Sequence, residues 1–380
     1  MKSDAEGIEH MFKDGKFTGE VRFLSSNINY KSNQNKYAVA IGGFFKYELA
    51  EYQGFNAALE LSTTHDIAAL SGKNNKRNEN LSGASHSYTQ LSEAYINYAY
   101  KDFSLRLGRQ SRDTPLADTD DIRMASDSFE AYLANYTKDN FRLLGGALLS
   151  WQGYDAGIDN GWVKLSKDGV YLLGAIYEDT TLEANLWYYS INGKAGDTLA
   201  NNSFYVDIAE HYHLTHHIFL HGGLQYLRQK ELDKSGVEAT IYGLSSELVV
   251  YNIGFNFAYN KSRKHQGKQS FSGFGGGTLF TSMDNMILDN ITADRDVNAY
   301  VGGISYDFSD FNLLYAYGDF QGSADTANVS ESIVEQNIAL SYEKDAITIS
   351  AIYTKQDDKK ATGINGGSWN NLRLQAIYNF

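Results

Sequence analysis

The sequence predicts an all-β protein, a transmembrane antiparallel β-barrel of about eighteen strands. Three observations lead to this fold class. The chain holds 28 Tyr and 20 Phe but a single Pro in 380 residues, apolar and polar residues alternate with a period of two, and short turns alternate with long polar connections. Proline cannot donate a hydrogen bond to a strand ladder, so its near absence suits a chain built of strands.

The composition excludes several other classes of protein. The mean hydropathy is -0.41, and no apolar run approaches the ~18 residues that indicate a membrane helix. A barrel strand alternates lipid-facing with lumen-facing residues, so its average hydropathy is polar. The absence of Cys removes disulfides and thiolate metal sites. The net charge of -13 disfavours nucleic acid as a partner, because phosphate contacts need basic patches.

Residues 1–16 are expected to form a short N-terminal helical segment before a barrel that occupies residues 17–380. Ser3 and Glu6 fit a capping box, and Ile8, Met11 and Phe12 follow at helical spacing. No charged and apolar signal sequence opens the chain, so a signal peptide was removed or never present. We expect removal. No Pro-rich or low-complexity linker divides the rest, which indicates one large unit.

The alternation is clearest in residues 251–260, where odd positions are aromatic or apolar and even positions are small or polar. The last strand repeats the pattern: one face carries Leu372, Leu374, Ala376, Tyr378 and Phe380, and the other carries Arg373 and Gln375. The strands of a soluble sandwich would also alternate, so the period alone does not indicate a membrane.

The connections between the strands favour a membrane barrel. Four short turns are flanked by aromatic residues (100–103, 136–141, 306–311 and 342–346), and five connections are long and polar (64–88, 110–128, 152–168, 261–294 and 356–368). This asymmetry is typical of an outer-membrane barrel. Eighteen strands place both termini on the short-turn side. Sixteen is the alternative count, and barrels of either size have room for an aqueous channel.

The long loop 110–128 holds the only proline, Pro115, and a dense set of charges. The candidates for a pore constriction in and beside it are Arg109, Arg112, Asp113, Asp118, Asp120, Asp121 and Arg123. Carboxylates in a narrow passage concentrate cations, and opposed arginines orient dipolar solutes. The alternative is that these aspartates are solvated in an exposed loop or paired with Arg112 and Arg123.

Residues in and near this loop form a pattern: Gly108, Arg109 and Gln110, then Thr114, Pro115 and Leu116, Asp120 and Asp121, Arg123 and Met124, and 128–130, with 11–16 and 19–22 near the N-terminus. This pattern resembles the third-loop region of the OprD-type outer-membrane porins and of the related major porins of the Campylobacter type. The resemblance implies an eighteen-stranded barrel, often trimeric, whose third extracellular loop folds inward and narrows the pore. It also implies a ladder of basic lumen residues that face acidic groups on the inward loops, with carboxylate-bearing or zwitterionic solutes passing.

Strand parity places a second group of charged residues on the lumen wall: Glu20, Arg22, Glu93, Arg106, Arg142 and Arg373. Asp284 follows a glycine-rich stretch, 273–280, in the longest predicted loop and is a further constriction candidate. The aspartates of the third loop depart from a purely anion-guiding pore. We therefore expect a weak preference for cations.

Two groups of residues are candidate metal ligands. Asp118, Asp120 and Asp121 suit a divalent cation such as calcium, since hard cations prefer clustered carboxylates, although the glycine and spacing of an EF-hand are missing. Imidazoles crowded around one short turn suit a transition metal, but the sequence shows no carboxylate or thiol placed to complete that site: His211, His213, His216, His217 and His221. No other cofactor is expected.

The sequence therefore predicts a non-enzymatic porin of the bacterial outer membrane, through which ions and small hydrophilic solutes diffuse passively. The expected partners are the lipid bilayer, lipopolysaccharide and two further copies in a homotrimer. One alternative is a phospholipase-like barrel enzyme, but no Gly-x-Ser-x-Gly elbow or plausible triad is found. Another is a surface adhesin whose barrel is plugged.

Overall fold

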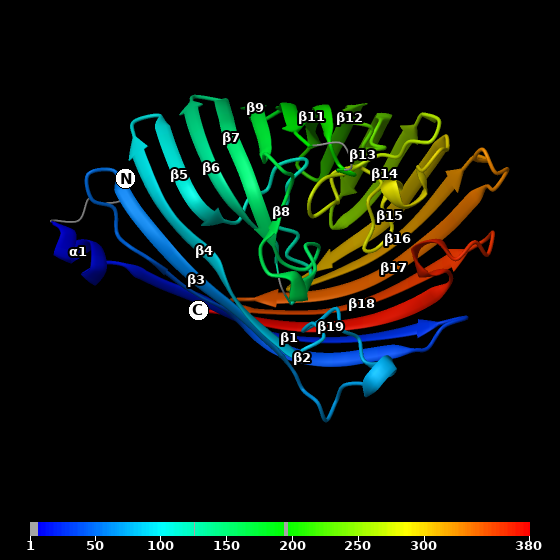
Figure 1. Cartoon of the computed structure of the whole chain (residues 1–380), viewed down its shortest axis with the longest axis horizontal. Helices are drawn as coiled ribbons and strands as arrows, with labels where there is room; N and C mark the ends of the chain where they lie inside the picture. The colour runs from blue at the N-terminus through cyan, green and yellow to red at the C-terminus, as the bar shows by residue number, and fades with distance from the viewer. Residues whose placement is uncertain (1–6, 125, 194–196) are drawn as a thin grey trace.

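The computed structural model describes residues 7–124, 126–193 and 197–380, which form one antiparallel sheet closed into a barrel (Figure 1). Eighteen long strands each pair with their neighbours, and pairing of the first with the last closes the barrel. The short β8 pairs with the end of β7 and with no other described strand. The predicted barrel of about eighteen antiparallel strands is confirmed.

Within the described residues the strands have the following bounds: β1 (Lys16–Tyr30), β2 (Lys36–Glu48), β3 (Phe55–Asp66), β4 (Ser87–Tyr100), β5 (Phe103–Gln110), β6 (Ser128–Lys138), β7 (Phe141–Gln152), β8 (Val163–Lys164), β9 (Val170–Glu178), β10 (Leu182–Ile191), β11 (Asn201–Thr215), β12 (Ile218–Glu231), β13 (Ala239–Val250), β14 (Ile253–Ser262), β15 (Val297–Phe308), β16 (Phe311–Gly322), β17 (Glu331–Lys344), β18 (Ile347–Asp358) and β19 (Trp369–Asn379). In the same described part of the chain, the helices are α1 (Ile8–Lys13) and four 3₁₀ turns, η1 (Asn74–Lys76), η2 (Ile158–Asn160), η3 (Leu288–Ile291) and η4 (Ile364–Gly366).

The observed strands extend past several predicted ends. The alternation predicts that the first strand ends at residue 26, but β1 continues to Tyr30 because residues 27–30 pair with residues 369–372 of β19. Cross-strand pairing outweighs the polar composition of this segment. The two-residue β8 was not predicted, since it lies within a long polar loop and gains its strand geometry only from Ser150 and Trp151 of β7.

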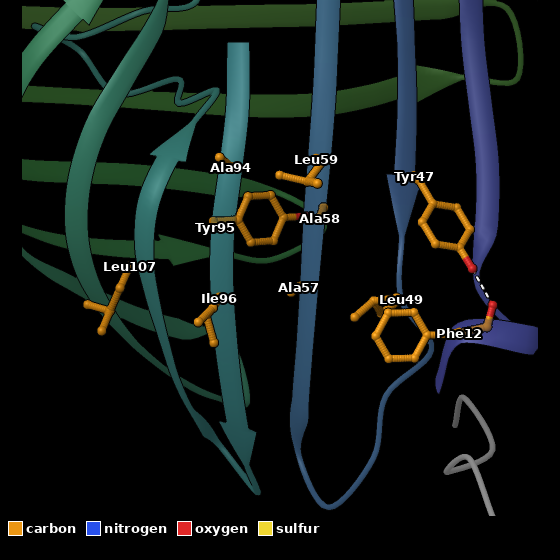
Figure 2. Close-up of a pocket in the computed structure, with 10 residues that line it drawn as sticks. All are labelled: Phe12, Tyr47, Leu49, Ala57, Ala58, Leu59, Ala94, Tyr95, Ile96 and Leu107. Atoms are coloured by element: carbon orange, nitrogen blue, oxygen red, sulfur yellow. Dashed lines mark hydrogen bonds between the residues drawn. The ribbon is translucent and has the colours of Figure 1, made fainter. Parts of the chain in front are cut away.

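Helix α1 lies beside the barrel near the C-terminus of the chain (Figure 1). The predicted capping residues Ser3 and Glu6 lie outside the described residues. The N–H of Ala50 donates to the carbonyl of Met11 at 3.0 Å, which ties the helix to the turn after β2. Phe12 contributes to an apolar groove of about 450 Å³ on the outer wall over β2 to β5 (Figure 2). Among the described residues, no helix is long and apolar enough to cross a membrane.

The outer face of the barrel is apolar, and its short-turn end is rich in aromatic contacts. Leu372 and Leu374 of β19 are 43% and 44% exposed, whereas Arg373 between them is 4% exposed, so alternate residues face opposite sides as the period requires. Ring pairs such as Phe17 with Tyr47, and Phe308 with Phe311, lie beside the short turns with centroids 4.5 Å and 5.2 Å apart. The wall therefore has an apolar exterior and a mixed interior.

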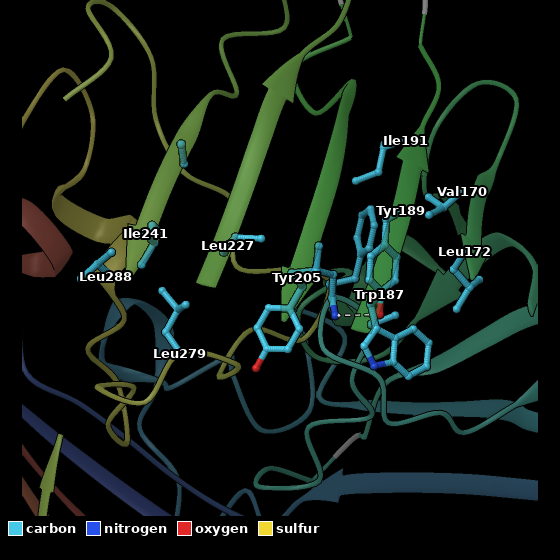
Figure 3. Packing of buried hydrophobic residues seen from close by; sticks show 14 of the residues in the cluster. Val170, Leu172, Trp187, Tyr189, Ile191, Tyr205, Leu227, Ile241, Leu279 and Leu288 are labelled. Atoms are coloured by element: carbon cyan, nitrogen blue, oxygen red, sulfur yellow. Dashed lines mark hydrogen bonds between the residues drawn. The ribbon is translucent and has the colours of Figure 1, made fainter. Parts of the chain in front are cut away.

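The interior of the barrel is divided into two unlike halves. A buried apolar cluster follows the lumen side from β6 to β17 and includes Trp187, Tyr189 and Phe320. Figure 3 shows side chains of β9 to β13 in this cluster together with Leu279 and Leu288, which come from the connection between β14 and β15 and belong to the same cluster. Burial of each side chain of this size contributes about 1.5–3 kcal/mol to the stability of the folded protein. Along β1 to β5 and β17 to β19, buried charged side chains line much of the lumen, together with a small second apolar cluster of Leu24, Ala38, Ala40, Leu81 and Met124.

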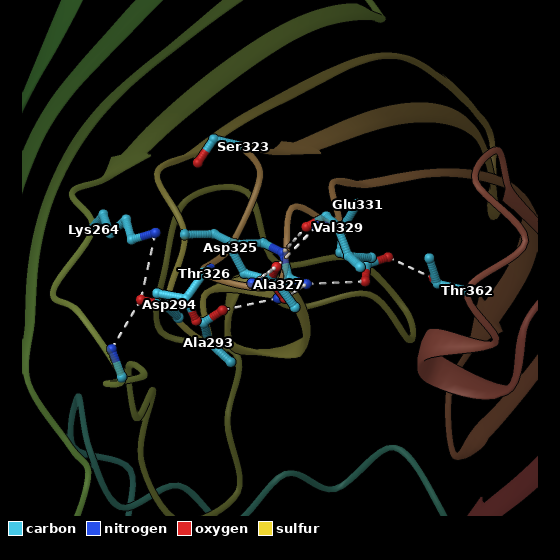
Figure 4. Close-up of polar contacts among 12 residues, drawn as sticks. Lys264, Ala293, Asp294, Ser323, Asp325, Thr326, Ala327, Val329, Glu331 and Thr362 are labelled. Atoms are coloured by element: carbon cyan, nitrogen blue, oxygen red, sulfur yellow. Dashed lines mark hydrogen bonds and ion pairs between the residues drawn. The ribbon is translucent and has the colours of Figure 1, made fainter.

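Three of the long connections are named by their order at the long-loop end: the third loop (111–127), the fourth loop (153–169) and the seventh loop (263–296). A polar cluster fixes the base of the seventh loop to its neighbours (Figure 4). Arg295 contacts Asp325 at 2.8 Å and Glu331 at 3.4 Å, and the hydroxyl of Thr362 donates to Glu331 at 2.5 Å. The seventh loop is thus held at its rim while its middle enters the lumen.

Candidate pore constriction

The third loop leaves β5, crosses the barrel interior and returns to β6. Asp121 meets Arg22 of β1, with N–O distances of 2.8 Å and 2.9 Å. The N–H of Leu116 donates to the hydroxyl of Tyr189 on β10 at 3.3 Å. The loop therefore spans the lumen between two distant strands, and the predicted inward fold is observed.

Arg22 is the centre of the contact between the third loop and the wall. Its Nε donates to Glu20 at 2.6 Å, its two terminal nitrogens donate to Asp121, and one of them also donates to the carbonyl of Arg123. Arg22 is only 3% exposed. A guanidinium that bonds a carboxylate through two nitrogens fixes direction as well as charge. Asp121 is therefore paired with an arginine of the wall, not with Arg112 or Arg123 of its own loop.

A second group of charges joins the third loop, the seventh loop and β19. Arg123 donates to Asn285 at 3.3 Å and lies 5.2 Å from the ring centre of Tyr154. The neighbouring Asp284 accepts from Arg373 at 2.5 Å and from Thr354 at 2.8 Å. Burial raises the pKa of Asp284, but Arg373 and Arg123 lower it more, so it lies below its usual value. The structure thus brings the predicted Asp284 and Arg373 together beside Arg123.

Two further aspartates of the third loop, Asp113 and Asp118, accept hydrogen bonds from the backbone of the loop itself. Asp113 accepts from the N–H of Thr119 at 3.2 Å, and Asp118 accepts from the N–H of Asp120 at 2.9 Å. Burial and the neighbouring Asp113 raise the pKa of Asp118. Burial and Asp155 of the fourth loop raise the pKa of Asp120 to about 7.

The predicted calcium ligands do not share one position. Asp121 is directed to Arg22, while Asp118 bonds the backbone of Asp120. Across the part of the chain that the structure describes, no group of three or more His, Asp or Glu residues is arranged to hold a metal ion. A divalent cation at these carboxylates stays a prediction.

A third group of charges lies on the lumen side of β2, β4 and β5. Lys46 forms an ion pair with Glu93, and Glu93 also accepts from the N–H of Ser111 at 3.0 Å. The guanidinium of Arg106 lies 4.1 Å from the ring centre of Tyr95. These contacts attach the first residue of the third loop to the wall.

Arg112 extends this group from the third loop. Its Nε donates to Gln110 at 2.7 Å. Burial and the nearby Arg106 lower the pKa of Arg112 to about 10, so the side chain remains charged at neutral pH.

Two predicted site residues lie away from these groups. Arg109 is opposite Ala94 and Glu130 in the ladder, and its guanidinium stacks 4.5 Å from the ring centre of Trp162 in the fourth loop. Because β5 stays regular to Gln110, Arg109 shares the outer face with the 41% exposed Leu107. The expectation of a lumen position is therefore not met for Arg109. Arg142 keeps its predicted strand but lies exposed beside the short turn, opposite Thr137.

A cavity of about 380 Å³ lies between the third loop and the lumen face of β1 to β4. Four carboxylates and two cationic side chains line it: Glu20, Glu60, Glu93, Asp121, Arg22 and Lys46. Lys46 and Glu60 were not among the predicted lumen residues. Each has the lumen-facing parity of its alternating strand, as Glu20 and Arg22 do, and this parity is the signal that would have identified it.

The histidines of the turn between β11 and β12 have carboxylate neighbours that the sequence analysis did not find. His211 lies opposite His221, with ring centres 4.5 Å apart. Glu183 lies 3.4 Å from His211, and Glu247 lies 3.3 Å from His221. These four side chains form a row across β10 to β13, in which the described residues bring no three ligands to a common metal position.

A closed eighteen-strand barrel with an inward third loop is the fold of the outer-membrane porins. No protein-family model and no curated protein matches this sequence. Solved porin structures do match. Acinetobacter baumannii OccAB2 (16% identity) and OccAB4 (15%) give TM-scores of 0.81 and 0.82, covering 97% and 96% of this chain and 98% of each of theirs.

The outer-membrane protein OpdK of Pseudomonas aeruginosa gives a TM-score of 0.81 at 16% identity, covering 97% of this chain and 99% of its own. The fold implied by the OprD-type resemblance is thereby confirmed. The Campylobacter-type part of the resemblance stays a prediction.

Proposed function

We propose that this protein is a porin of the bacterial outer membrane, a water-filled channel for passive diffusion of ions and small hydrophilic solutes. The observation that carries the proposal is the charged cavity between the third loop and β1 to β4. It lies in the half of the lumen that the apolar cluster does not fill. The fold shared with solved porins supports the same function.

We further propose that the channel weakly prefers cations. Carboxylates outnumber cationic groups around the cavity, and in a confined space they raise the local cation concentration. The test is the reversal potential of the purified protein in a planar bilayer with a salt gradient. A potential of the sign expected for cation flow supports the proposal, and anion preference contradicts it.

Replacement of Asp118, Asp120 and Asp121 together by Asn should reduce the cation-to-anion permeability ratio by about 2- to 5-fold, since each removed charge acts at short range in a confined space. The matched control is the triple variant Asp102, Asp139 and Asp345→Asn, which makes the same three substitutions in exposed short turns. Equal permeability ratios in the two triple variants would refute the role of the third-loop aspartates.

Liposome swelling with sugars of graded size separates the porin from the two alternatives. A porin admits small sugars and rejects larger ones, whereas a plugged adhesin barrel admits none. Release of fatty acid from detergent-dispersed phospholipid would reveal a barrel enzyme. We propose no catalytic role for any residue of this chain.

The solutes that we propose are cations and zwitterions, because of the charge around the cavity. The structure of one similar porin, OpdK, was solved with vanillate. It matches this chain with a TM-score of 0.79 at 14% identity. The proposed surroundings are the bilayer and lipopolysaccharide, which the exposed apolar residues of the outer face support. A homotrimer stays a prediction from the resemblance.

A further inference from the structure

The glycine-rich stretch of the seventh loop lies directly against the third loop. We call residues 271–280 the glycine strap. The N–H of Asp118 donates to the carbonyl of Phe274 at 2.8 Å, and the N–H of Phe274 donates to the carbonyl of Leu116 at 3.1 Å. These bonds form a short parallel bridge between Ala117 and Phe274. The third loop is therefore hydrogen-bonded to the strap through its backbone, at the point where it crosses the lumen.

Two glycines allow this close approach. A Cβ on Gly273 would lie 2.6 Å from the Cα of Leu116, and a Cβ on Gly275 would lie 2.3 Å from the carbonyl oxygen of Asp118. Both glycines have positive φ, +109° and +93°, a region that other residues rarely adopt. Gly277 has a similar φ of +83°, but a Cβ there would meet nothing within 4 Å. The strap thus contains its own control position.

Two glutamines of β12 anchor the strap to the barrel wall. Gln229 exchanges two hydrogen bonds with the backbone of Phe271, at 2.8 Å and 2.9 Å. Gln225 donates to the carbonyl of Thr278 at 2.9 Å and accepts from the N–H of Phe280 at 3.2 Å. The glutamines are four residues apart on one face of β12 and are buried. Each holds one side of the segment that contacts the third loop.

Aromatic packing fixes the middle of the strap. The ring of Phe274 lies 5.0 Å from that of Phe271 and 5.3 Å from that of Trp151, both nearly edge to face. Phe274 is 3% exposed. Such aromatic pairs stabilise a fold by about 0.5–1.5 kcal/mol in addition to the free energy gained from burying their surface. A continuous set of contacts therefore runs from β12 through the strap to the third loop.

We propose that the glycine strap sets the position of the third loop, and with it the width of the passage between that loop and β1. Gly273, Gly275, Gln225 and Gln229 are then positioning residues that act through the third loop. The inference rests on the proposed porin function. The strap contacts Leu116 and Asp118 of the third loop, and Asp121, three residues further along the same loop, contacts Arg22 and lines the charged cavity. A displacement of residues 116–118 by the strap is therefore transmitted over a short stretch of chain to the wall of the passage.

The first test compares Gly275→Ala with Gly277→Ala. Both substitutions place a side chain at positive φ, but only the first meets the third loop. Restoring ordinary contact from 2.3 Å to 3.4 Å moves the loop by about 1 Å. We expect Gly275→Ala to lower the single-channel conductance by ~1.5-fold or more, and Gly277→Ala to leave it unchanged. Heat-modifiable mobility on gels confirms that both barrels fold.

A second variant tests the anchor. Gln229→Leu keeps the approximate size of the side chain and removes both hydrogen bonds to Phe271. It changes no charge, so the reversal potential should stay that of the unmodified protein while open-channel current noise increases. A change in reversal potential without a change in noise would contradict a positioning role for Gln229.

A spectroscopic distance separates this inference from the porin proposal. The chain has no Cys, so two introduced cysteines can be labelled without competing thiols. One is Ile122→Cys in the third loop, and the other is Lys355→Cys on the exposed face of β18. The distribution of distances between the two labels should differ between Gly275→Ala and Gly277→Ala, whether or not the protein conducts. Identical distributions overturn the role of the strap. Absence of channels from the unmodified protein overturns the proposed function alone.

Discussion

Replacement of Arg22 by Met is expected to destabilise the barrel by about 3–5 kcal/mol, because removing one partner of a buried ion pair leaves the other charge uncompensated. Glu20, which is 7% exposed, would lose its cation, and Asp121 would lose its contact with the wall. We also expect higher conductance, since the third loop is no longer held against β1. Unfolding by urea, followed by tryptophan fluorescence, and single-channel recording measure the two effects.

Two variants sharpen this test. Arg142→Met removes an exposed arginine at the short-turn end and should change stability by no more than about 0.5 kcal/mol. Arg22→Lys keeps the charge but loses the planar fork that bonds Glu20 and Asp121 together, so an intermediate loss is expected. Equal stability and conductance in Arg22→Met and Arg142→Met would show that Arg22 does not hold the third loop.

The alternation of residues along the strands is the reason that much of the fold could be predicted. A period of two assigns each residue to one of two faces, and this is why Glu20, Arg22, Glu93 and Arg373 could be placed on the lumen side. The period was not applied to Arg109, which was grouped with the constriction because it belongs to the third-loop pattern. It lies in the strand predicted over 103–110, which matches β5, and three residues from the lumen-facing Arg106, so the alternation itself places it on the outer face.

The partners of the lumen charges could not be predicted, because the period says nothing about which loop reaches which wall. Arg22 and Asp121 are 99 residues apart in the sequence, and Asp284 and Arg373 are 89 apart. Their contacts depend on how the third and seventh loops fold inside the barrel. The glycine run at 273–277 was visible in the sequence, but its contact with the third loop was not.

The apolar half of the lumen left a signal that the sequence analysis did not use. In β10, residues 186–189 are Leu, Trp, Tyr and Tyr, so both faces are apolar and the alternation in polarity is lost. Leu186 and Tyr188 are each 46% exposed on the outer face, whereas Trp187 and Tyr189 are 3% and 1% exposed inside. When both faces of a strand are apolar, either both faces are buried in protein, or one face is buried and the other contacts lipid. The loss of alternation therefore marks the wall against which the loops pack.

Replacement of Asp284 by Asn is expected to cost about 3–5 kcal/mol at neutral pH, since Arg373 is buried and loses its carboxylate. Nε and Nη1 of Arg373 have no hydrogen-bond partner among the described residues, so Asp284 is the group that compensates its charge. We expect the middle of the seventh loop to leave β19 and open-channel noise to rise. Urea unfolding and bilayer recordings at pH 7 measure this, with Asp310→Asn in an exposed short turn as the control.

The pH dependence gives the same contact an independent test. Because Arg373 and Arg123 hold the pKa of Asp284 below its usual value, the carboxylate stabilises the fold above the unfolded pKa of about 3.9. That stability is lost only as the pH falls through the lower folded value. The unmodified protein should therefore lose this contribution below about pH 4, and Asp284→Asn should lack it at every pH.

A double variant decides whether the two groups act on each other. If Asp284 serves mainly to neutralise Arg373, then Arg373→Met combined with Asp284→Asn removes both charges and should be more stable than Asp284→Asn alone. The coupling free energy for such neighbours is about 0.5–3 kcal/mol. Strict additivity of the two substitutions would mean that the seventh loop is held at β19 by other contacts, such as the bond from Thr354.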